Sequence, residues 1–225
     1  MNLGFARSIG RGFVMVFNNA QIDITESEKY INVNEFFAEN SEGYRAFWQD
    51  MQAKYPGWEI VFTYRNCDPP MEFLTGIGME LLESSFIAEL DNDGFKPAGK
   101  KHAMLITPEN FDLFADFHDK ASPDMFWTSA RIAEKPEQWR IYMIGDNAYV
   151  MMSLWGDTPE IFALVAPGAA VGASLLTVAA KFAFDNDRVK VLYFIDTDDP
   201  LGMDAACEVG FVVTGRSVAY HGVVK

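Results

Sequence analysis

The chain is poor in the residues that build disulfide frameworks and metal sites. Its 225 residues include only two cysteines, Cys67 and Cys207, and three histidines. The cysteines lie far apart and form no CxxC pattern, which excludes a disulfide-stapled fold and the usual zinc spacing. The three histidines are not spaced as a metal-binding set. We therefore expect no metal ion, and so few cysteines fit a reducing cytoplasm.

Positive charge is also scarce. The sequence has 18 Lys and Arg against 32 Asp and Glu, which gives a formal net charge of −14. Nucleic-acid binding depends on clustered basic side chains that neutralise phosphates, so this balance excludes that class of partner. An acidic surface favours cationic substrates such as amines, although solubility alone also accounts for it.

The start of the chain lacks a long hydrophobic run. Arginines interrupt the short apolar stretch within MNLGFARSIGRGFVMVF. The stretch is too short and too polar for a signal peptide or a membrane span. We expect no membrane association and a cytoplasmic protein.

Apolar residues are abundant, and they indicate a globular chain. Hydrophobic residues make up 49% of the sequence, with 19 Phe and 11 Met. A chain of this length and composition forms one large core or two smaller ones. The Phe and Met residues are interpreted as packing residues.

The most informative segment is EIFALVAPGAAVGASLLTVAAKFAF, residues 160–184. It predicts an apolar strand over 161–165, a turn of small residues, and a helix of about four turns. Such a turn brings backbone N–H groups close to an anion at a helix start, where the helix dipole also favours negative charge. The segment therefore predicts a phosphate-binding site. The alternative is a tight strand–helix connection that is merely rich in small residues.

The rest of the second half alternates strands and helices around this segment. Strands are predicted at 102–106, 139–143, 148–154, 189–195, 211–213 and 217–220, and helices after Thr107, over 126–133 and after Asp199. Residues 189–195 are almost continuously apolar, which is typical of a strand buried on both faces of a parallel sheet. Residues 161–195 then form a right-handed parallel crossover.

The first half repeats part of this order. A helix over 42–53 and strands over 58–64 and 85–90 are predicted there. Three pairs of landmarks recur at nearly one spacing, 131 or 132 residues: Trp58 with Val189, Asp68-Pro69 with Asp199-Pro200, and Gly78 with Gly210. This spacing indicates a duplicated unit, with chance recurrence of common motifs as the alternative.

The boundary between the halves is expected in a polar segment that contains Pro and Gly. We predict a truncated half over 1–96, a linker over 97–101 and a complete domain over 102–225. The first half is expected to lack the opening strand and the two helices of the second. The fold class predicted is α/β, with a central mixed β-sheet flanked by helices.

The second half resembles the GNAT N-acetyltransferase superfamily over residues 102–221. The order of elements agrees, the predicted strand ends in Val165-Ala166-Pro167, Gly172 matches a glycine of the family's loop, and Gly210-Phe211 matches its closing element. Ala169 stands where Arg or Gln is usual, and Ser174 where Gly or Ala is usual. The whole chain then resembles a tandem GNAT protein with a truncated first half.

The resemblance implies a site for acetyl-CoA in the second half. In this family the loop amides bind the pyrophosphate of coenzyme A, and the preceding strand hydrogen-bonds the pantetheine. The residues that would do so here are Leu164, Val165, Ala169, Ala170, Val171, Gly172, Ala173 and Ser174. The first half has no glycine-rich loop at this place, so no coenzyme A is expected there.

Acetyl transfer to an amine requires a base for the amine and an acid for the leaving thiolate. Glu160 is the first candidate base and Asp196 the second; a surface role and a helix-capping loop are the respective alternatives. The family often has a tyrosine where this chain has Ala206. The neighbouring Cys207 is therefore the candidate acid, with packing of a small hydrophobic side chain as its alternative.

These residues predict an acyl-CoA-dependent N-acyltransferase that acetylates a small amine or an amino terminus by direct attack in a ternary complex. Two other functions stay open: a catalytically weak acyl-CoA-binding or regulatory protein, and an acidic protein-interaction module. The expected partner is a small-molecule or peptide amine. We expect a monomer or a homodimer.

Overall fold

The computed structural model describes residues 7–9, 12–17, 20–123 and 125–225. They fall into two compact units, one of residues 1–85 with 215–225 and one of residues 86–214. The segment 97–101 lies inside the second unit, which spans residues 86–214. Two long strands, β6 (Glu80–Asp91) and β12 (Val212–Val223), each contribute residues to both units. The linker at 97–101 therefore stays a prediction about where the duplicated halves join.

The first unit is a mixed sheet with two α-helices and one short 3-10 helix. Its strands are β1 (Arg7–Ile9), β2 (Gly12–Phe17), β3 (Ala20–Thr25), β4 (Tyr30–Asn34), β5 (Glu59–Arg65) and part of β12 (Val212–Val223). Its helices are η1 (Glu26–Glu28), α1 (Ser41–Lys54) and α2 (Met71–Gly76). Neighbouring strands from β1 to β4 are antiparallel, β4 and β5 are parallel, and β5 pairs antiparallel with β12.

Aromatic rings fill the core of the first unit. Phe47 and Met51 are the buried residues of α1, four positions apart on one helical face. The rings of Phe36 and Phe47 stack with centroids 4.1 Å apart, and those of Tyr44 and Phe73 at 4.7 Å. Tyr44 and Phe73 thus join α1 to α2 through their side chains.

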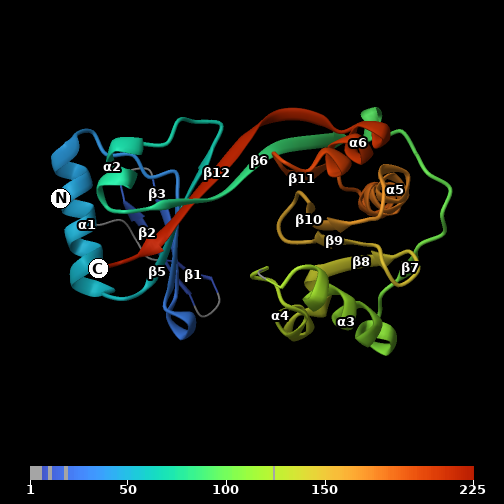
Figure 1. Cartoon of the computed structure of the whole chain (residues 1–225), viewed down its shortest axis with the longest axis horizontal. Helices are drawn as coiled ribbons and strands as arrows, with labels where there is room; N and C mark the ends of the chain where they lie inside the picture. The colour runs from blue at the N-terminus through green and yellow to red at the C-terminus, as the bar shows by residue number, and fades with distance from the viewer. Residues whose placement is uncertain (1–6, 10–11, 18–19, 124) are drawn as a thin grey trace. The chain divides into compact units, whose positions relative to one another are not determined.

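The second unit is a sheet covered by helices on both faces (Figure 1). Its strands are part of β6 (Glu80–Asp91), β7 (Met104–Leu105), β8 (Trp139–Met143), β9 (Tyr149–Ser153), β10 (Glu160–Val165) and β11 (Lys190–Asp196). Its helices are η2 (Asn92–Gly94), η3 (Pro108–Asn110), α3 (Phe111–Ala121), α4 (Ser129–Glu134), η4 (Pro136–Gln138), α5 (Ala169–Asp185) and α6 (Pro200–Val209).

Two cores lie in this unit, one on each face of the sheet. Phe114 of α3 and Ile132 of α4 pack with Ile141 of β8. On the other face, Leu175 of α5 and Val209 of α6 belong to the core that includes the central strands. Alternate residues of β8 point to opposite faces, as the two-residue period of a strand requires.

Residues 95–103, which we call the strap, lie along α5. The backbone of Ala98 exchanges two hydrogen bonds with Thr177 Oγ1, at 2.9 and 2.8 Å. The N–H of Lys101 donates to Ser174 Oγ at 3.5 Å. Gly99 has a φ of +71°, and a Cβ on it would collide with Ser174. Glycine is therefore required where the strap crosses the helix.

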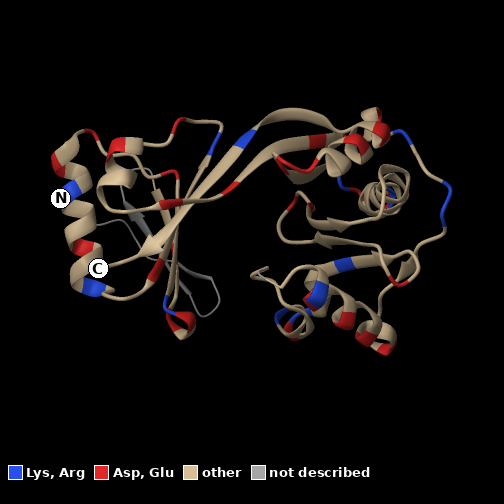
Figure 2. Cartoon of the chain, viewed as in Figure 1, with Lys and Arg blue, Asp and Glu red and all other residues tan. Residues whose placement is uncertain are grey.

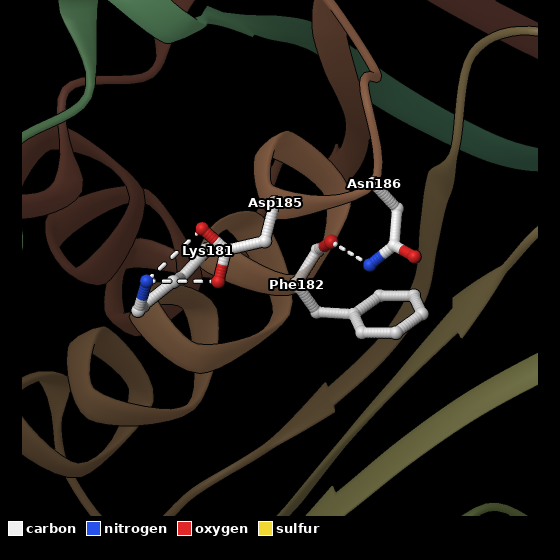
Figure 3. A network of polar contacts seen from close by, with 4 residues as sticks. All are labelled: Lys181, Phe182, Asp185 and Asn186. Atoms are coloured by element: carbon white, nitrogen blue, oxygen red, sulfur yellow. Dashed lines mark hydrogen bonds and ion pairs between the residues drawn. The ribbon is translucent and has the colours of Figure 1, made fainter.

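Short polar contacts close the last turn of α5 (Figure 3). Lys181 Nζ lies 3.0 and 2.8 Å from the carboxylate oxygens of Asp185. Asn186 Nδ2 donates to the carbonyl oxygen of Phe182 at 2.8 Å. The amide thereby satisfies one of the carbonyl groups that a helix C-terminus leaves without a backbone partner.

The predicted duplication is confirmed in the order and direction of the strands. The series β2, β3, β4, α1, β5, α2, β6 matches β8, β9, β10, α5, β11, α6, β12. The described strands follow one another in the order β1-β2-β3-β4-β5-β12-β6-β11-β10-β9-β8-β7. Each half therefore places its last strand beside the penultimate strand of the other: β12 beside β5, and β6 beside β11.

The structure corrects two expectations. The first half does have an opening strand, because β1 pairs with β2 as β7 pairs with β8. Only two residues separate β1 from β2 in the sequence, so the counterparts of α3 and α4 have no room there. The predicted strands 211–213 and 217–220 are one strand, β12. At its middle, a Cβ on Gly215 would overlap Asn66, so the glycine lets the strand pass.

The helices of the described residues are shorter or more polar than a membrane span. Within them, no helix has both the length and the hydropathy required to cross a membrane. Acidic residues occur on helices and strands of both units (Figure 2).

Candidate functional site

The parallel strands β10 and β11 are paired only at their beginning. Two residue pairs join them, Glu160 with Leu192 and Ile161 with Tyr193. Both strands continue beyond these pairs, β10 to Val165 and β11 to Asp196. The two strands therefore part after Ile161, at the carboxyl end of the sheet where open α/β sheets bind ligands.

A β-bulge in β10 lies directly after the last of these pairs. Ile161 is opposite Met152 of β9, but Ala163 is opposite Met151, so Phe162 is the extra residue. A bulge bends its strand and increases the local twist. The bend begins at the residue where β10 leaves β11.

The start of α5 lies at the same end of β10. Gly168 is the N-cap residue, and the N–H groups of Val171 and Gly172 donate to its carbonyl oxygen at 3.0 and 3.1 Å. In the described structure no side chain caps this helix, and its first turn contains no acid. Ala170 is exposed and Ala169 half-buried. Such a helix start presents N–H groups and a partial positive charge to an anion.

The corresponding place in the first unit is closed. Five residue pairs join β4 to β5, from Tyr30 with Glu59 to Asn34 with Thr63. The N–H of Glu35 then donates to the carbonyl oxygen of Thr63 at 2.8 Å, so contact continues beyond the strand. Of the two crossovers, only that of the second unit opens.

Comparison with known proteins identifies the fold. No family model matches the sequence, and no curated protein matches it. A GCN5-related N-acetyltransferase from Sphaerobacter thermophilus is similar in structure, with a TM-score of 0.67 and 13% identity over 92% of this chain and 77% of the other. One from Kribbella flavida gives 0.66 and 10% over 92% and 88%. A tandem GNAT protein from the clavulanic acid biosynthesis pathway, solved without acetyl-CoA, gives 0.62 and 13% over 95% and 82%.

The chain has a doubled GNAT fold. The likeness to a tandem protein over 95% of the chain agrees with the matching order of elements in the two halves. Both the resemblance and the mixed α/β class predicted from the sequence are thereby confirmed at the level of the fold.

The residues predicted to hold the cofactor divide into two groups in this GNAT fold. The residues on β10 and at the first turn of α5 are partly or fully accessible: Leu164, Val165, Ala169 and Ala170. The later residues are buried: Val171, Gly172, Ala173 and Ser174. Ser174 Oγ donates to the carbonyl oxygen of Ala170 at 2.9 Å and also accepts from the strap. The accessible group is the one that a ligand reaches without moving the helix.

Gly172 has a packing role that the sequence did not distinguish from ligand binding. A Cβ on it would lie 3.0 Å from the Cβ of Ala205 in α6 and 3.3 Å from Leu164 Cδ2. Such contacts are tighter than ordinary van der Waals distances, so the missing side chain lets α5 approach α6 and β10 closely. The glycine shapes the GNAT core behind the loop.

The three candidate catalytic residues occupy separate places. Glu160 is half-buried at the start of β10, one residue before the strands part. Asp196 is exposed at the end of β11, four residues beyond the partner of Glu160 and thus roughly 13 Å along the strand. Cys207 is an exposed free thiol on α6, next to the buried Ala206. The structure does not gather them at one point.

A buried tyrosine lies at the point where the strands part. Tyr193, the partner of Ile161, is 3% exposed, and its hydroxyl approaches Gly202 at the start of α6. Burial, and then the charges of Asp199 and Asp196, raise the pKa of this phenol. Asp199 Oδ1 accepts from the N–H of Gly202 at 2.9 Å, which confirms the helix cap expected from Asp199-Pro200. Tyr193 therefore stays protonated and neutral, and its hydroxyl can donate a hydrogen bond.

Four aromatic rings form one group beside the bulge. Trp139 lies 5.1 Å from Trp127, 5.2 Å from Trp155 and 5.3 Å from Phe162, measured between ring centroids. Trp155 is 36% exposed, whereas Trp139 is almost fully buried. The three tryptophans pack against one another around Phe162.

A buried histidine fixes the segment that carries Trp127. His118 Nε2 lies 2.7 Å from the carbonyl oxygen of Trp127, and Nδ1 lies 2.7 Å from the hydroxyl of Tyr149. A carbonyl oxygen only accepts, so Nε2 carries a hydrogen and donates it to Trp127. Ser122 Oγ lies 3.2 Å from the same hydroxyl. This network could not be predicted from the sequence, because its members come from distant positions.

The described residues contain no cluster of side chains that could bind a metal ion. In the parts of the chain that the structure covers, no group of three or more His, Cys, Asp or Glu could hold a metal ion.

Proposed function

We propose that the second unit binds acetyl-CoA and transfers its acetyl group to a small amine or an amino terminus. The observation that carries this proposal is the parting of β10 and β11 beside the uncapped start of α5. The backbone of Leu164 and Val165 would hydrogen-bond the pantetheine, and the N–H groups of Ala169 and Ala170 would bind the pyrophosphate. GNAT-fold structures that are acetyltransferases support the same assignment.

The proposed reaction is a direct attack in a ternary complex. The amine nitrogen forms a bond to the thioester carbonyl carbon, and the carbon–sulfur bond then breaks to release the thiolate. Glu160 takes the proton from the amine, directly or through water, because it stands next to the opening. The thiolate receives a proton from solvent or from the exposed thiol of Cys207. Most of the rate enhancement comes from holding the two substrates together.

Binding of the cofactor is tested by calorimetry with acetyl-CoA and a change at Ala170. This alanine is exposed in the first turn of α5. Ala170→Glu favours the helix through its dipole but repels a pyrophosphate, whereas Ala170→Gln has the same size without the charge. We expect affinity to fall at least tenfold in Ala170→Glu and to change little in Ala170→Gln. Wild-type protein that gives neither heat nor a thermal shift would refute the proposal.

A second function is supported by the scattered candidate catalytic residues. A catalytically weak acyl-CoA-binding protein would need only the opening and the helix start. Thiol release from acetyl-CoA over a panel of amines separates the two functions. We expect release that depends on the amine and that falls in Glu160→Gln without loss of acetyl-CoA affinity. Tight binding without thiol release with any amine would favour the binding protein.

A further inference from the structure

A cavity of about 240 Å³ lies on the other helical layer of the second unit, between η3, α3, α4 and β8. Its floor is made by Ile132, Trp139 and Ile141, which are at most 6% exposed. Its rim includes Ala133 and Pro136, which are exposed. None of the residues proposed to bind the cofactor lines it. The cavity is thus a separate feature that opens to solvent at one side.

The interior of this cavity is apolar. Thr107 and the indole N–H of Trp139 are the polar side-chain groups among the lining residues. The Thr107 side chain already serves in the cap of η3. It accepts from the backbone of Asn110, and it hydrogen-bonds the carboxylate of Glu109. A ligand inside would therefore meet hydrocarbon and an indole ring, and it would gain free energy by leaving water.

The rim of the cavity is acidic. Glu109 follows a lining proline, and Glu134 and Glu137 flank the lining residues Ala133 and Pro136; all three carboxylates are exposed. The hydrogen bond from Thr107 lowers the pKa of Glu109, so this carboxyl is ionised at neutral pH. Lys135 is a basic residue in the same stretch. Figure 2 shows further acidic residues along α3. Arg131 precedes the lining residue Ile132 and is also basic, so three carboxylates against two cations leave this stretch with a net negative charge.

We propose that this cavity binds a small primary ammonium ion that carries an apolar group of about six carbon atoms. The apolar group would fill the cavity over Trp139 and Ile141, and the ammonium would stay at the rim near the carboxylates. An apolar cavity of about 150 Å³ holds benzene, so the larger volume here suits a hexyl chain or a phenyl ring. Binding of such an ion needs neither acetyl-CoA nor acetyl transfer.

The cavity is connected with the opening in the sheet through a pair of rings. Trp139 forms part of its floor, and the ring of Trp139 lies 5.3 Å from that of Phe162, the bulge residue of β10. An occupant that moves Trp139 would therefore press on the strand that parts from β11. Because a ligand in the cavity would contact the indole of Trp139, we expect the tryptophan fluorescence to change on binding.

The first experiment measures binding of hexylammonium, hexanol and hexanoate by calorimetry, with tryptophan fluorescence as a second readout. We expect hexylammonium to bind more tightly than hexanol, and hexanol more tightly than hexanoate. Affinity should rise about fourfold for each methylene from butylammonium to hexylammonium, as expected for burial of hydrocarbon. Equal affinity for the three head groups would overturn the part of the proposal that concerns charge, and no binding of any of them would overturn all of it.

Two pairs of variants locate the site. Ala133→Phe fills the rim, while Ala130→Phe adds the same ring to an exposed alanine of α4 that does not line the cavity. We expect the first to lower hexylammonium affinity at least tenfold and the second to leave it unchanged. Glu134→Gln with Glu137→Gln should weaken hexylammonium a fewfold and leave hexanol unchanged. Equal losses in both phenylalanine variants would place the ligand elsewhere and refute the site.

Acetyl-CoA calorimetry on the same variants separates this site from the proposed cofactor site. Ala133→Phe should retain acetyl-CoA binding, because it lies on the helical layer opposite α5. Failure of acetyl-CoA binding in wild-type protein, with hexylammonium binding intact, would refute the proposed function alone. The reverse result would refute the cavity site alone.

Discussion

The two halves of the chain share an order of elements but differ where a ligand would bind. In the first unit, β4 and β5 are joined along five residue pairs, whereas β10 and β11 of the second are joined along two. Asn40 caps α1 by accepting from the N–H of Gly43 at 3.0 Å, whereas Gly168 leaves the start of α5 without a side-chain cap. At this place the first unit pairs its backbone groups internally, whereas the second unit leaves its backbone groups available to a ligand. The same fold therefore gives a closed partner and an open one.

The halves also differ in how their paired helices are spaced. The fourth residue of α1 is Tyr44, whose ring stacks on Phe73 of α2. The fourth residue of α5 is Gly172, which lies against Ala205 of α6. Large rings hold the first pair of helices apart, and the absent side chain brings the second pair together. Interiors are packed to uniform density by either means, but only the small residues leave the strand end uncovered.

The largest effect is expected when the second unit is given a large side chain at this helix position. Gly172→Phe should lower the free energy of unfolding by about 3 kcal/mol, because the ring has no space between α5 and α6. Gly172→Ala should be nearly neutral, since its helix propensity offsets the tight contact with Ala205. Urea denaturation followed by circular dichroism measures both. A fully stable Gly172→Phe would mean that the helices do not pack at this residue.

The closed strand pair should lose stability in alkali. Burial, and then the carboxylates of Glu59, Glu83 and Glu28, raise the pKa of Tyr30 to about 12. The raised pKa means that the unfolded chain releases this proton first, near pH 10. The contribution of Tyr30 is therefore fully present below pH 10 and is lost as pH rises to about 12. Tyr30→Phe should flatten this part of the stability curve, and an unchanged curve would contradict it.

The capping residue of the first unit should affect stability without affecting the ligand. Asn40→Ala removes the side chain that accepts from Gly43 and should cost about 1 kcal/mol. Because α1 belongs to the closed unit, acetyl-CoA affinity should stay at the wild-type value. Calorimetry and thermal unfolding on one sample test both halves of this prediction. A loss of acetyl-CoA affinity of tenfold or more would mean that the ligand has been assigned to the wrong unit.

The smallest effect is expected for the ion pairs at the ends of the two long helices. Asp50 precedes Lys54 by four residues in α1, whereas Lys181 precedes Asp185 by four in α5. An acid placed before a base agrees with the helix dipole, and the reverse order opposes it. Lys54→Ala should therefore cost more than Lys181→Ala, with both within about 0.5 kcal/mol. Denaturant midpoints give the comparison, and the opposite ranking would contradict it.

Much of the second half could be predicted because each element carries its own local signal. The period of apolar residues and the signals at Thr107 and Asp199 placed most strands and helices within one or two residues of those found, while α4 begins three residues later than predicted. Strands β1 to β4 were not predicted. Their segment is interrupted by polar residues, and much of its support comes from neighbouring strands. Cross-strand support of this kind has no signature within a single segment.

The candidate site was predictable only as a place in the chain. The sequence marked the loop before α5, but it could not tell the accessible Ala170 from the packed Gly172 and Ser174. That difference depends on α6 and on the strap, which reach α5 from distant parts of the chain. The bulge at Phe162 has no glycine or proline to announce it, because it is a matter of register with β9.

The sequence by itself determined the kind of fold, its duplication and the turn of small residues at the start of α5. These follow from the period of apolar residues and from small residues at a turn, which act over short distances along the chain. Tertiary structure alone decided that each half lends its last strand to the other, and that one strand pair closes while the other opens. Those outcomes depend on which strands compete for the same hydrogen bonds, and this competition is settled only when the whole sheet assembles.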